Sequence, residues 1–117
     1  MKTDPIHPPR KFLVGQDKQI EISHCANVDL KPDEQVTFVT DSNKEYDVVR
    51  KSWGFYATPS VNSRLKNEGF KTALVKNSKG QWYIMLVENE KMDDFQTYLY
   101  KEANEVVEWL DEKPLNL

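Results

Sequence analysis

An alternation of apolar and polar residues between positions 20 and 30 constrains the fold of this chain most strongly. The pattern has a period of two, which is typical of a β-strand with one covered face and one face in water. Its apolar members are Ile20, Ile22, Ala26, Val28 and Leu30. Because eleven residues make a long strand, we expect a bend or β-bulge near His24 and Cys25.

The neighbouring segments predict an antiparallel meander. Residues 11–14, 35–40 and 45–53 have strand-like sequences, and short turn-forming segments separate them. Further along the chain, strands at residues 70–76 and 81–88 flank a turn in which Gly80 takes the left-handed position, which predicts a hairpin. The strand at 81–88 is apolar on both faces, so we expect it at the centre of a sheet and covered on both sides.

Two helices complete the predicted fold. Thr58 can cap a short helix that begins at Pro59 and ends near Asn67, before Gly69. A longer helix is predicted from Glu90 to Asp111. Its apolar stripe contains Met92, Phe95, Leu99, Val106 and Leu110. The predicted class is α+β, with a mainly antiparallel curved sheet of five or six strands, a short helix between strands and a long C-terminal helix packed on the sheet.

The length of 117 residues suits one domain. Three prolines among residues 1–10 predict an extended N-terminal arm, followed by a single α+β domain at 11–113 and a tail at 114–117. No apolar run is long enough to span a bilayer, and the N-terminus lacks the apolar stretch of a signal peptide. A single cysteine, Cys25, excludes an internal disulfide. We therefore expect a cytoplasmic protein without a membrane partner.

The net charge of −3 is unevenly distributed. Residues 44–80 carry eight Lys and Arg against three Asp and Glu, whereas residues 81–117 carry three against nine. The two segments could neutralise each other in the fold. Alternatively, the basic segment could form a face that attracts anionic ligands.

The segment from Trp53 to Arg64 contains most of the groups that could hold a ligand. Three aromatic residues surround Gly54, and aromatic faces suit sugar rings and nucleobases. The predicted helix start and nearby cationic side chains could hold a phosphate or carboxylate beside a stacked ring. The predicted ligand-binding residues are Arg50, Trp53, Tyr56, Thr58, Ser60 and Arg64. The alternative is that Trp53, Phe55 and Tyr56 pack a corner of the sheet.

No motif in the sequence indicates catalysis. The four glycines are isolated, so there is no glycine-rich phosphate loop, and neither a nucleophile elbow nor an HExxH pattern occurs. His24 and Cys25 are adjacent on a predicted strand and should therefore point to opposite faces. The histidines and the cysteine lack metal-ligand spacing. We predict no catalytic residue, no metal and no cofactor.

The segment from Tyr46 to Ser60, together with Asn62, Arg64-Leu65 and Gly69-Phe70, resembles a family of small uncharacterised bacterial proteins. That family is associated with gene clusters for surface polysaccharides and nucleotide-activated sugars. The likeness extends from about Phe12 to Asp111 and brings no catalytic residues with it. It implies a bacterial protein with a sugar-related ligand.

Three functions remain open at this stage. The leading one is an accessory binding protein for an anionic sugar or nucleotide-sugar in surface-glycan metabolism. The second is a protein–protein interaction module in which the basic central face meets an acidic protein, or the acidic C-terminal helix of another copy in a homo-oligomer. The third is an unrecognised small enzyme. The net negative charge argues against binding of nucleic acid.

Overall fold

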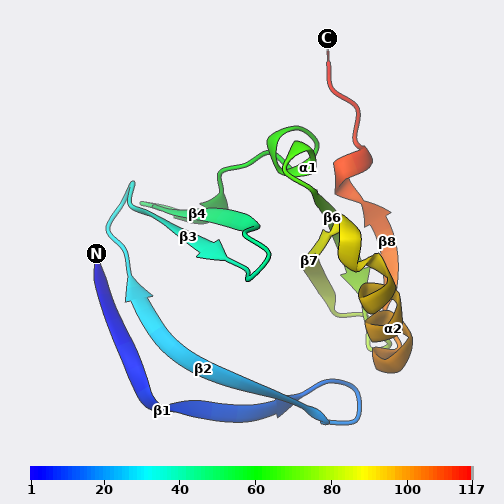
Figure 1. The fold of residues 1–117 in the computed structure, drawn as a ribbon, viewed down its shortest axis with the longest axis horizontal. Helices are drawn as coiled ribbons and strands as arrows, with labels where there is room; N and C mark the ends of the chain where they lie inside the picture. The colour runs from blue at the N-terminus through cyan, green and yellow to red at the C-terminus, as the bar shows by residue number, and fades with distance from the viewer. Residues whose placement is uncertain (117) are drawn as a thin grey trace. The chain divides into compact units, whose positions relative to one another are not determined.

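The computed structural model describes residues 1–116, which form an α+β fold with mostly antiparallel strands. The predicted class is confirmed, but the predicted single curved sheet is wrong. The described residues contain eight strands in three small sheets, ordered β1-β2, β3-β4-β5 and β7-β6-β8 (Figure 1). The strands are β1 (Lys2–Val14), β2 (Ile20–Asp29), β3 (Gln35–Val39), β4 (Glu45–Lys51), β5 (Gly54–Ala57), β6 (Phe70–Lys76), β7 (Trp82–Glu88) and β8 (Glu105–Trp109).

The chain divides into two compact units. The first contains residues 1–38 and 47–58, and the second contains residues 39–46 and the chain from Pro59 onward. The first unit holds the β1-β2 ribbon and most of the β3-β4-β5 sheet. The second holds the β7-β6-β8 sheet and the helices.

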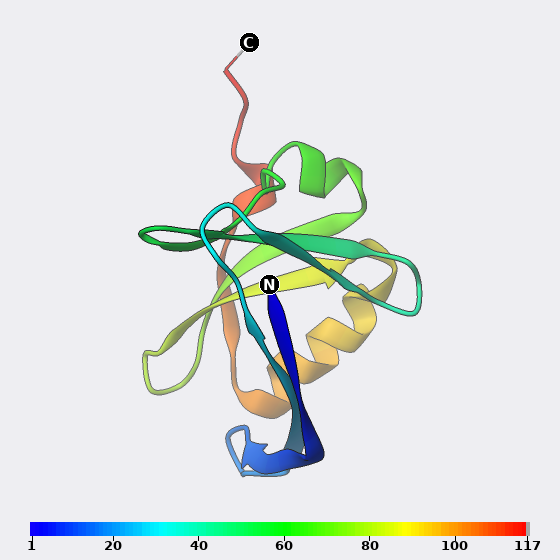
Figure 2. The ribbon, with the colours of Figure 1, turned by 90° about the vertical axis from the view of Figure 1, so that its left-hand side faces the viewer.

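In the first unit, β1 and β2 form a long antiparallel ribbon (Figure 2), and residues 2–5 and 10–14 of β1 pair with β2. Phe12 lies opposite Ile22 and Val14 opposite Ile20, so these apolar side chains share one face. The pairing shifts between Pro5 and Arg10, opposite His24 and Ala26 on β2, which confirms the bend expected there. From Lys2 onward, the segment predicted as an N-terminal arm is part of β1.

The β4-β5 hairpin is the other main element of the first unit. Lys51 pairs with Gly54, so Ser52 and Trp53 form its two-residue turn. The predicted strand at 45–53 therefore ends two residues early. Gly54 has a φ of 147°, a conformation that L side chains rarely adopt, and begins β5.

In the second unit, helix α2 (Met92–Glu102) packs on the face of the sheet that carries Ala73 and Val75. Leu99 completes this buried cluster. The partly buried residues around it are Met85, Phe95, Val106 and Trp109. Each large apolar side chain buried here contributes about 1.5–3 kcal/mol to folding.

The predicted helix from Glu90 to Asp111 is wrong in its C-terminal half. A 3-10 turn, η1 (Asn89–Lys91), precedes α2, and α2 ends where Ala103 turns left-handed with a φ of 53°. The N–H of Asn104 then donates to the carbonyl of Leu99. Beyond this cap the β-branched pair Val106 and Val107 continues as β8, and a second 3-10 turn, η2 (Leu110–Glu112), follows.

The prediction that the strand at 81–88 is central and covered is also wrong. β6 is the central strand and β7 is an edge. Trp82, Tyr83 and Ile84 are 50%, 45% and 55% exposed. A strand that is apolar on both faces is typical of the centre of a sheet, but β7 is an edge whose first residues are left in contact with solvent.

No helix among the described residues is long and apolar enough to cross a membrane.

Candidate functional site

Two exposed aromatic rings lie in contact on the β4-β5 hairpin. Trp53 occupies the turn and Tyr56 lies on β5, with ring centroids 5.9 Å apart and ring planes 18° from parallel. The side chains are 69% and 46% exposed. The two rings therefore stack on each other while leaving surface available to a ligand.

The register of the hairpin determines which charged side chain shares their face. Tyr56 lies opposite Val49, and the next pair on that face is Lys51 with Gly54. The Lys51 ammonium lies 2.5 Å from the Asp33 carboxylate. This hydrogen bond and the charge of Asp33, with a smaller contribution from Tyr56, raise the pKa of Lys51 above its ordinary value. A cation and an anion thus stand beside the aromatic pair.

Asp33 is held in place by backbone hydrogen bonds to β4. Its N–H donates to the carbonyl of Arg50 at 2.6 Å, and the N–H of Arg50 donates to the carbonyl of Glu34 at 2.9 Å. The carboxylate of Glu34 accepts from the N–H of Lys31 at 2.8 Å and from the N-terminal ammonium at 3.1 Å. These bonds, with that from Lys31 foremost, lower the pKa of Glu34. The turn that carries Asp33 is therefore fixed at both ends.

Arg50, one of the predicted ligand-binding residues, lies on the other face of the hairpin. It is paired with Phe55, and its guanidinium donates to the backbone carbonyl of Lys51. The structure therefore places Lys51, and not Arg50, on the face of Tyr56. Sequence reasoning missed Lys51 because the assignment depends on the two-residue turn, which sets the strand alternation on both sides of it.

Thr58 does not cap a helix. Its hydroxyl donates to the side-chain carbonyl of Gln35 at 3.3 Å, and its N–H donates to the carbonyl of Asp47. The predicted helix from Thr58 to Asn67 shortens to α1 (Arg64–Asn67), a single turn. Such a short helix offers little of the dipole that a phosphate site would need.

Ser60 and Arg64 belong to the second unit, whereas the other four predicted residues belong to the first. The Ser60 hydroxyl accepts a hydrogen bond from the N–H of Arg64 at 3.0 Å and so helps to start α1. The Arg64 guanidinium lies 3.7 Å from the carboxylate of Glu68. Of the predicted set, the structure brings Trp53 and Tyr56 into contact. The binding roles of Thr58, Ser60, Arg50 and Arg64 stay predictions.

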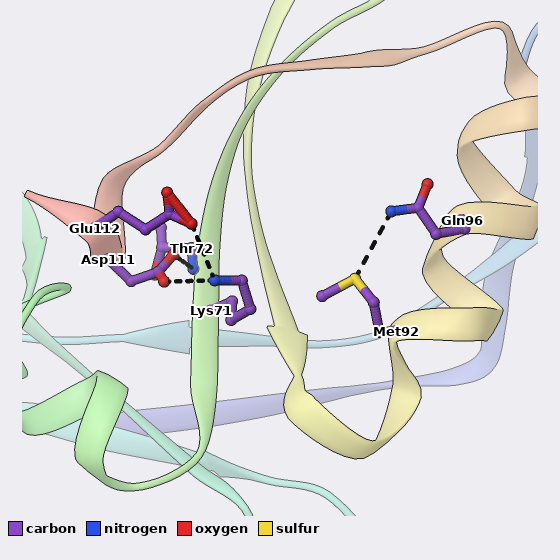
Figure 3. A network of polar contacts seen from close by, with 6 residues as sticks. All are labelled: Lys71, Thr72, Met92, Gln96, Asp111 and Glu112. Atoms are coloured by element: carbon purple, nitrogen blue, oxygen red, sulfur yellow. Dashed lines mark hydrogen bonds and ion pairs between the residues drawn. The ribbon is translucent and has the colours of Figure 1, made fainter.

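The basic central segment and the acidic C-terminal segment meet within the second unit. Lys71 on β6 lies 2.8 Å from Asp111, and Lys76 lies 3.3 Å from Glu105 on β8. Asp111 also accepts a hydrogen bond from the N–H of Thr72 at 2.9 Å (Figure 3). These ion pairs fit mutual neutralisation for Lys71 and Lys76, and an anion-binding face stays a prediction.

Asp111 is the most deeply buried carboxylate of this network, at 1% exposure. Burial raises its pKa, but hydrogen bonds from Lys71 and Thr72 and the charge of Lys71 outweigh burial and bring the pKa below its ordinary value. The Lys71 ammonium also lies over the ring of Trp109, 4.7 Å from its centroid. The network joins β6 to the end of β8 and is structural in character.

The described residues contain no group of three or more His, Cys, Asp or Glu side chains that could hold a metal ion. Cys25 is exposed and His24 is half-buried, with its Nδ1 atom buried and without a hydrogen-bond partner. An open groove of about 490 Å³ lies along β8 and η2, and its lining includes Val107, Trp109 and Glu112. None of the predicted site residues lines that groove.

Comparisons of this chain with protein-family models, with curated proteins and with solved structures find no match.

Proposed function

We propose that this chain is a non-catalytic accessory binding protein that holds a sugar ring on the β4-β5 hairpin. The observation that carries the proposal is the exposed, stacked pair of Trp53 and Tyr56 beside the ion pair of Lys51 and Asp33. The flat C–H face of a sugar can lie against an aromatic ring. Its hydroxyls can accept hydrogen bonds from the ammonium and donate to the carboxylate.

The ligand class that we propose is an anionic sugar or a nucleotide-sugar. Lys51 supports this choice because it stays protonated at neutral pH and shares the face of the aromatic rings. The resemblance to bacterial proteins of surface-polysaccharide gene clusters points to the same ligands, in the cytoplasm where activated sugars are made. In this proposal Lys51 takes the role first predicted for Arg50.

The expected affinity is modest. Stacking on an aromatic side chain is worth about 1–3 kcal/mol per ring. An open surface with one or two stacked rings and a few hydrogen bonds should therefore give a Kd between about 10 µM and 1 mM. Affinity in this range requires measurement at high protein concentration.

Titrations followed by NMR test the proposal directly. The ligands are a neutral hexose, a hexuronic acid, a nucleoside diphosphate and nucleotide-sugars with neutral and acidic sugars. We expect shifts of the Trp53 indole N–H and of the backbone amides of β5 with the anionic sugar or a nucleotide-sugar, and loss of the β5 amide shifts in Trp53→Ala. The matched control is Trp82→Ala, which removes a 50% exposed tryptophan from the second unit and should leave binding intact.

The outcomes separate the ligand classes. Binding of the nucleotide-sugar and the nucleotide alone, with equal affinity, would assign the rings to the base and contradict a sugar site. Failure of the wild-type protein to respond to any ligand of the set would contradict the proposed function as a whole.

A second candidate function, protein–protein interaction, is favoured by the composition of the first unit. Val49 is the one buried hydrophobic residue among its described residues. Several large apolar side chains of this unit are exposed, including Leu13, Ile22, Val28 and Phe38. An isolated two-stranded ribbon is at best marginally stable in water, so a partner protein could supply the missing cover.

Hydrogen exchange of the β2 amides tests this second function. Slow exchange only after a partner protein is added would support it. Exchange as slow as that of β6 in the protein alone would contradict it.

A further inference from the structure

The edge strand β7 lacks the features that usually keep sheet edges apart. Exposed edges commonly carry Lys, Pro or a β-bulge, because their unpaired N–H and C=O groups otherwise recruit another strand. Residues 82–87 contain no charged residue and no proline, and β7 pairs with β6 in unbroken register from Trp82 to Glu88. Its first three residues are 45–55% exposed. An edge of this kind is expected to be covered by another strand.

The charges at the two ends of β7 indicate what that strand is. The hairpin turn before β7 carries Lys79 and no carboxylate. The segment after it is mainly acidic, with Glu88, Glu90, Asp93 and Asp94 against Lys91. A second β7 running antiparallel would bring the basic end of each strand to the acidic end of the other. A parallel arrangement would bring like charges together.

We propose that β7 pairs antiparallel with β7 of a second copy of this chain. The twofold axis runs perpendicular to the sheet beside Ile84, because only this direction places two antiparallel edges side by side in one continuous sheet. In this register Trp82 lies across from Leu86 of the second copy, and Tyr83 lies across from Met85. Beyond the strands themselves, the turn that carries Lys79 lies at the same end as the second copy's η1 (Asn89–Lys91), so Lys79 comes close to Glu90.

The paired sheets form one six-stranded sheet. The perpendicular axis leaves both copies of α2 on the same face of it. The apolar cross-strand pairs add to the backbone ladder, as aromatic and β-branched pairs do in antiparallel sheets. Each copy contributes one strand to the contact, whereas stable complexes bury roughly 1,200 Å² or more, so a concentration-dependent dimer is expected.

The opposite edge of the same sheet provides an internal comparison. β8 carries Glu105 and Glu108, charged residues of the type that protects an edge from pairing. Its apolar residue Val107 is 47% exposed, close to the 55% of Ile84. A charge introduced at Val107 should therefore have little effect on dimerisation, whereas the same charge at Ile84 should prevent it.

Sedimentation equilibrium over a range of concentrations tests the proposal. We expect the wild-type protein to dimerise, Ile84→Lys to weaken dimerisation at least tenfold, and Val107→Lys to behave as wild type. Circular dichroism of both variants verifies that the sheet is intact. A wild-type protein that stays monomeric up to about 1 mM would overturn the proposal, and so would equal dimerisation of the two variants.

A charge exchange tests the antiparallel direction. Lys79→Glu places like charges together at both ends of the paired strands and should weaken dimerisation several-fold. Adding Glu90→Lys restores both contacts and should return dimerisation toward the wild-type level. If the double variant dimerises no better than Lys79→Glu alone, the pairing direction proposed here is wrong.

Discussion

Lys71 and Asp111 form an ion pair of 2.8 Å in which the carboxylate is almost completely buried and the ammonium is partly exposed. The same carboxylate accepts the backbone N–H of Thr72, which is itself buried. One side chain of η2 therefore satisfies both a charge and a backbone donor on the central strand β6.

Asp111→Ala should destabilise the protein by about 1–3 kcal/mol, because it leaves the Thr72 N–H without its partner. The matched control is Glu112→Ala, which removes a 63% exposed carboxylate lying 3.7 Å from the same lysine. An exposed ion pair is worth about 0–1 kcal/mol, so this control should change little. Urea unfolding measures both variants, and equal losses would contradict a structural role for Asp111.

The same carboxylate predicts a loss of stability in acid. The folded-state pKa of Asp111 is below its unfolded value of 3.8, so the stability it contributes is present above pH 3.8 and is lost as the pH falls through the folded pKa. The difference in unfolding free energy between wild type and Asp111→Asn, measured from neutral pH downward, should shrink as the pH falls below 3.8. Parallel curves would show that Asp111 does not contribute through its charge.

Leu99→Ala should cost about 2–5 kcal/mol, because it opens a cavity between α2 and β6. Leu99 is 7% exposed and belongs to the cluster with Ala73 and Val75. Its neighbour Tyr100 is 89% exposed, so Tyr100→Ala should change the free energy of unfolding by less than about 0.5 kcal/mol. Thermal or urea unfolding gives both values. A small loss for Leu99→Ala would mean that α2 is not docked on the sheet.

Ala103→Gly should stabilise the protein by about 0.5–1 kcal/mol, because Ala103 is left-handed at the end of α2 and glycine adopts this conformation without steric cost. Ala57→Gly, in the extended strand β5, serves as the control and should not stabilise. A higher melting temperature for Ala103→Gly alone is the expected result.

Trp53 should be accessible to a soluble quencher. In a variant with Trp82→Phe and Trp109→Phe, iodide should quench its fluorescence efficiently, because 69% of the side chain is exposed. A second variant that keeps Trp109 alone should be quenched less, since that ring packs against Phe95 with centroids 6.0 Å apart. Full protection of Trp53 would assign it to packing and remove the basis of the proposed sugar site.

The sequence predicts well those elements whose signal is local. The alternation at residues 20–30 predicts β2 and its bend, and the turn at 77–80 predicts the β6-β7 hairpin. The end of α2 could not be predicted in this way. Leu99 and Val106 are seven residues apart, which fits two turns of helix, and alanine at position 103 gives no stop signal because it favours helix. The edge position of β7 is missed for another reason, because a strand that is apolar on both faces is typical of a sheet centre.

The aromatic residues of the candidate site could be predicted from the sequence, but the charged residue beside them could not. Trp53 and Tyr56 stand out because aromatic residues gather there. The choice between Arg50 and Lys51 depends on which of two adjacent residues faces Tyr56, and a turn of two residues decides that. The interpretation of Thr58 failed because its hydroxyl has a tertiary partner, Gln35, that is distant in sequence.

The contact between Trp53 and Tyr56 has a thermodynamic consequence for any ligand that binds there. Ordering a flexible side chain on binding costs about 0.5–1.5 kcal/mol, and two rings that already hold each other in the free protein avoid most of that cost. The stacked pair of Trp53 and Tyr56 is therefore preorganised for ligand binding. Removing Tyr56 would therefore do more than delete one stacking surface, because the ligand would then have to immobilise a freely rotating indole.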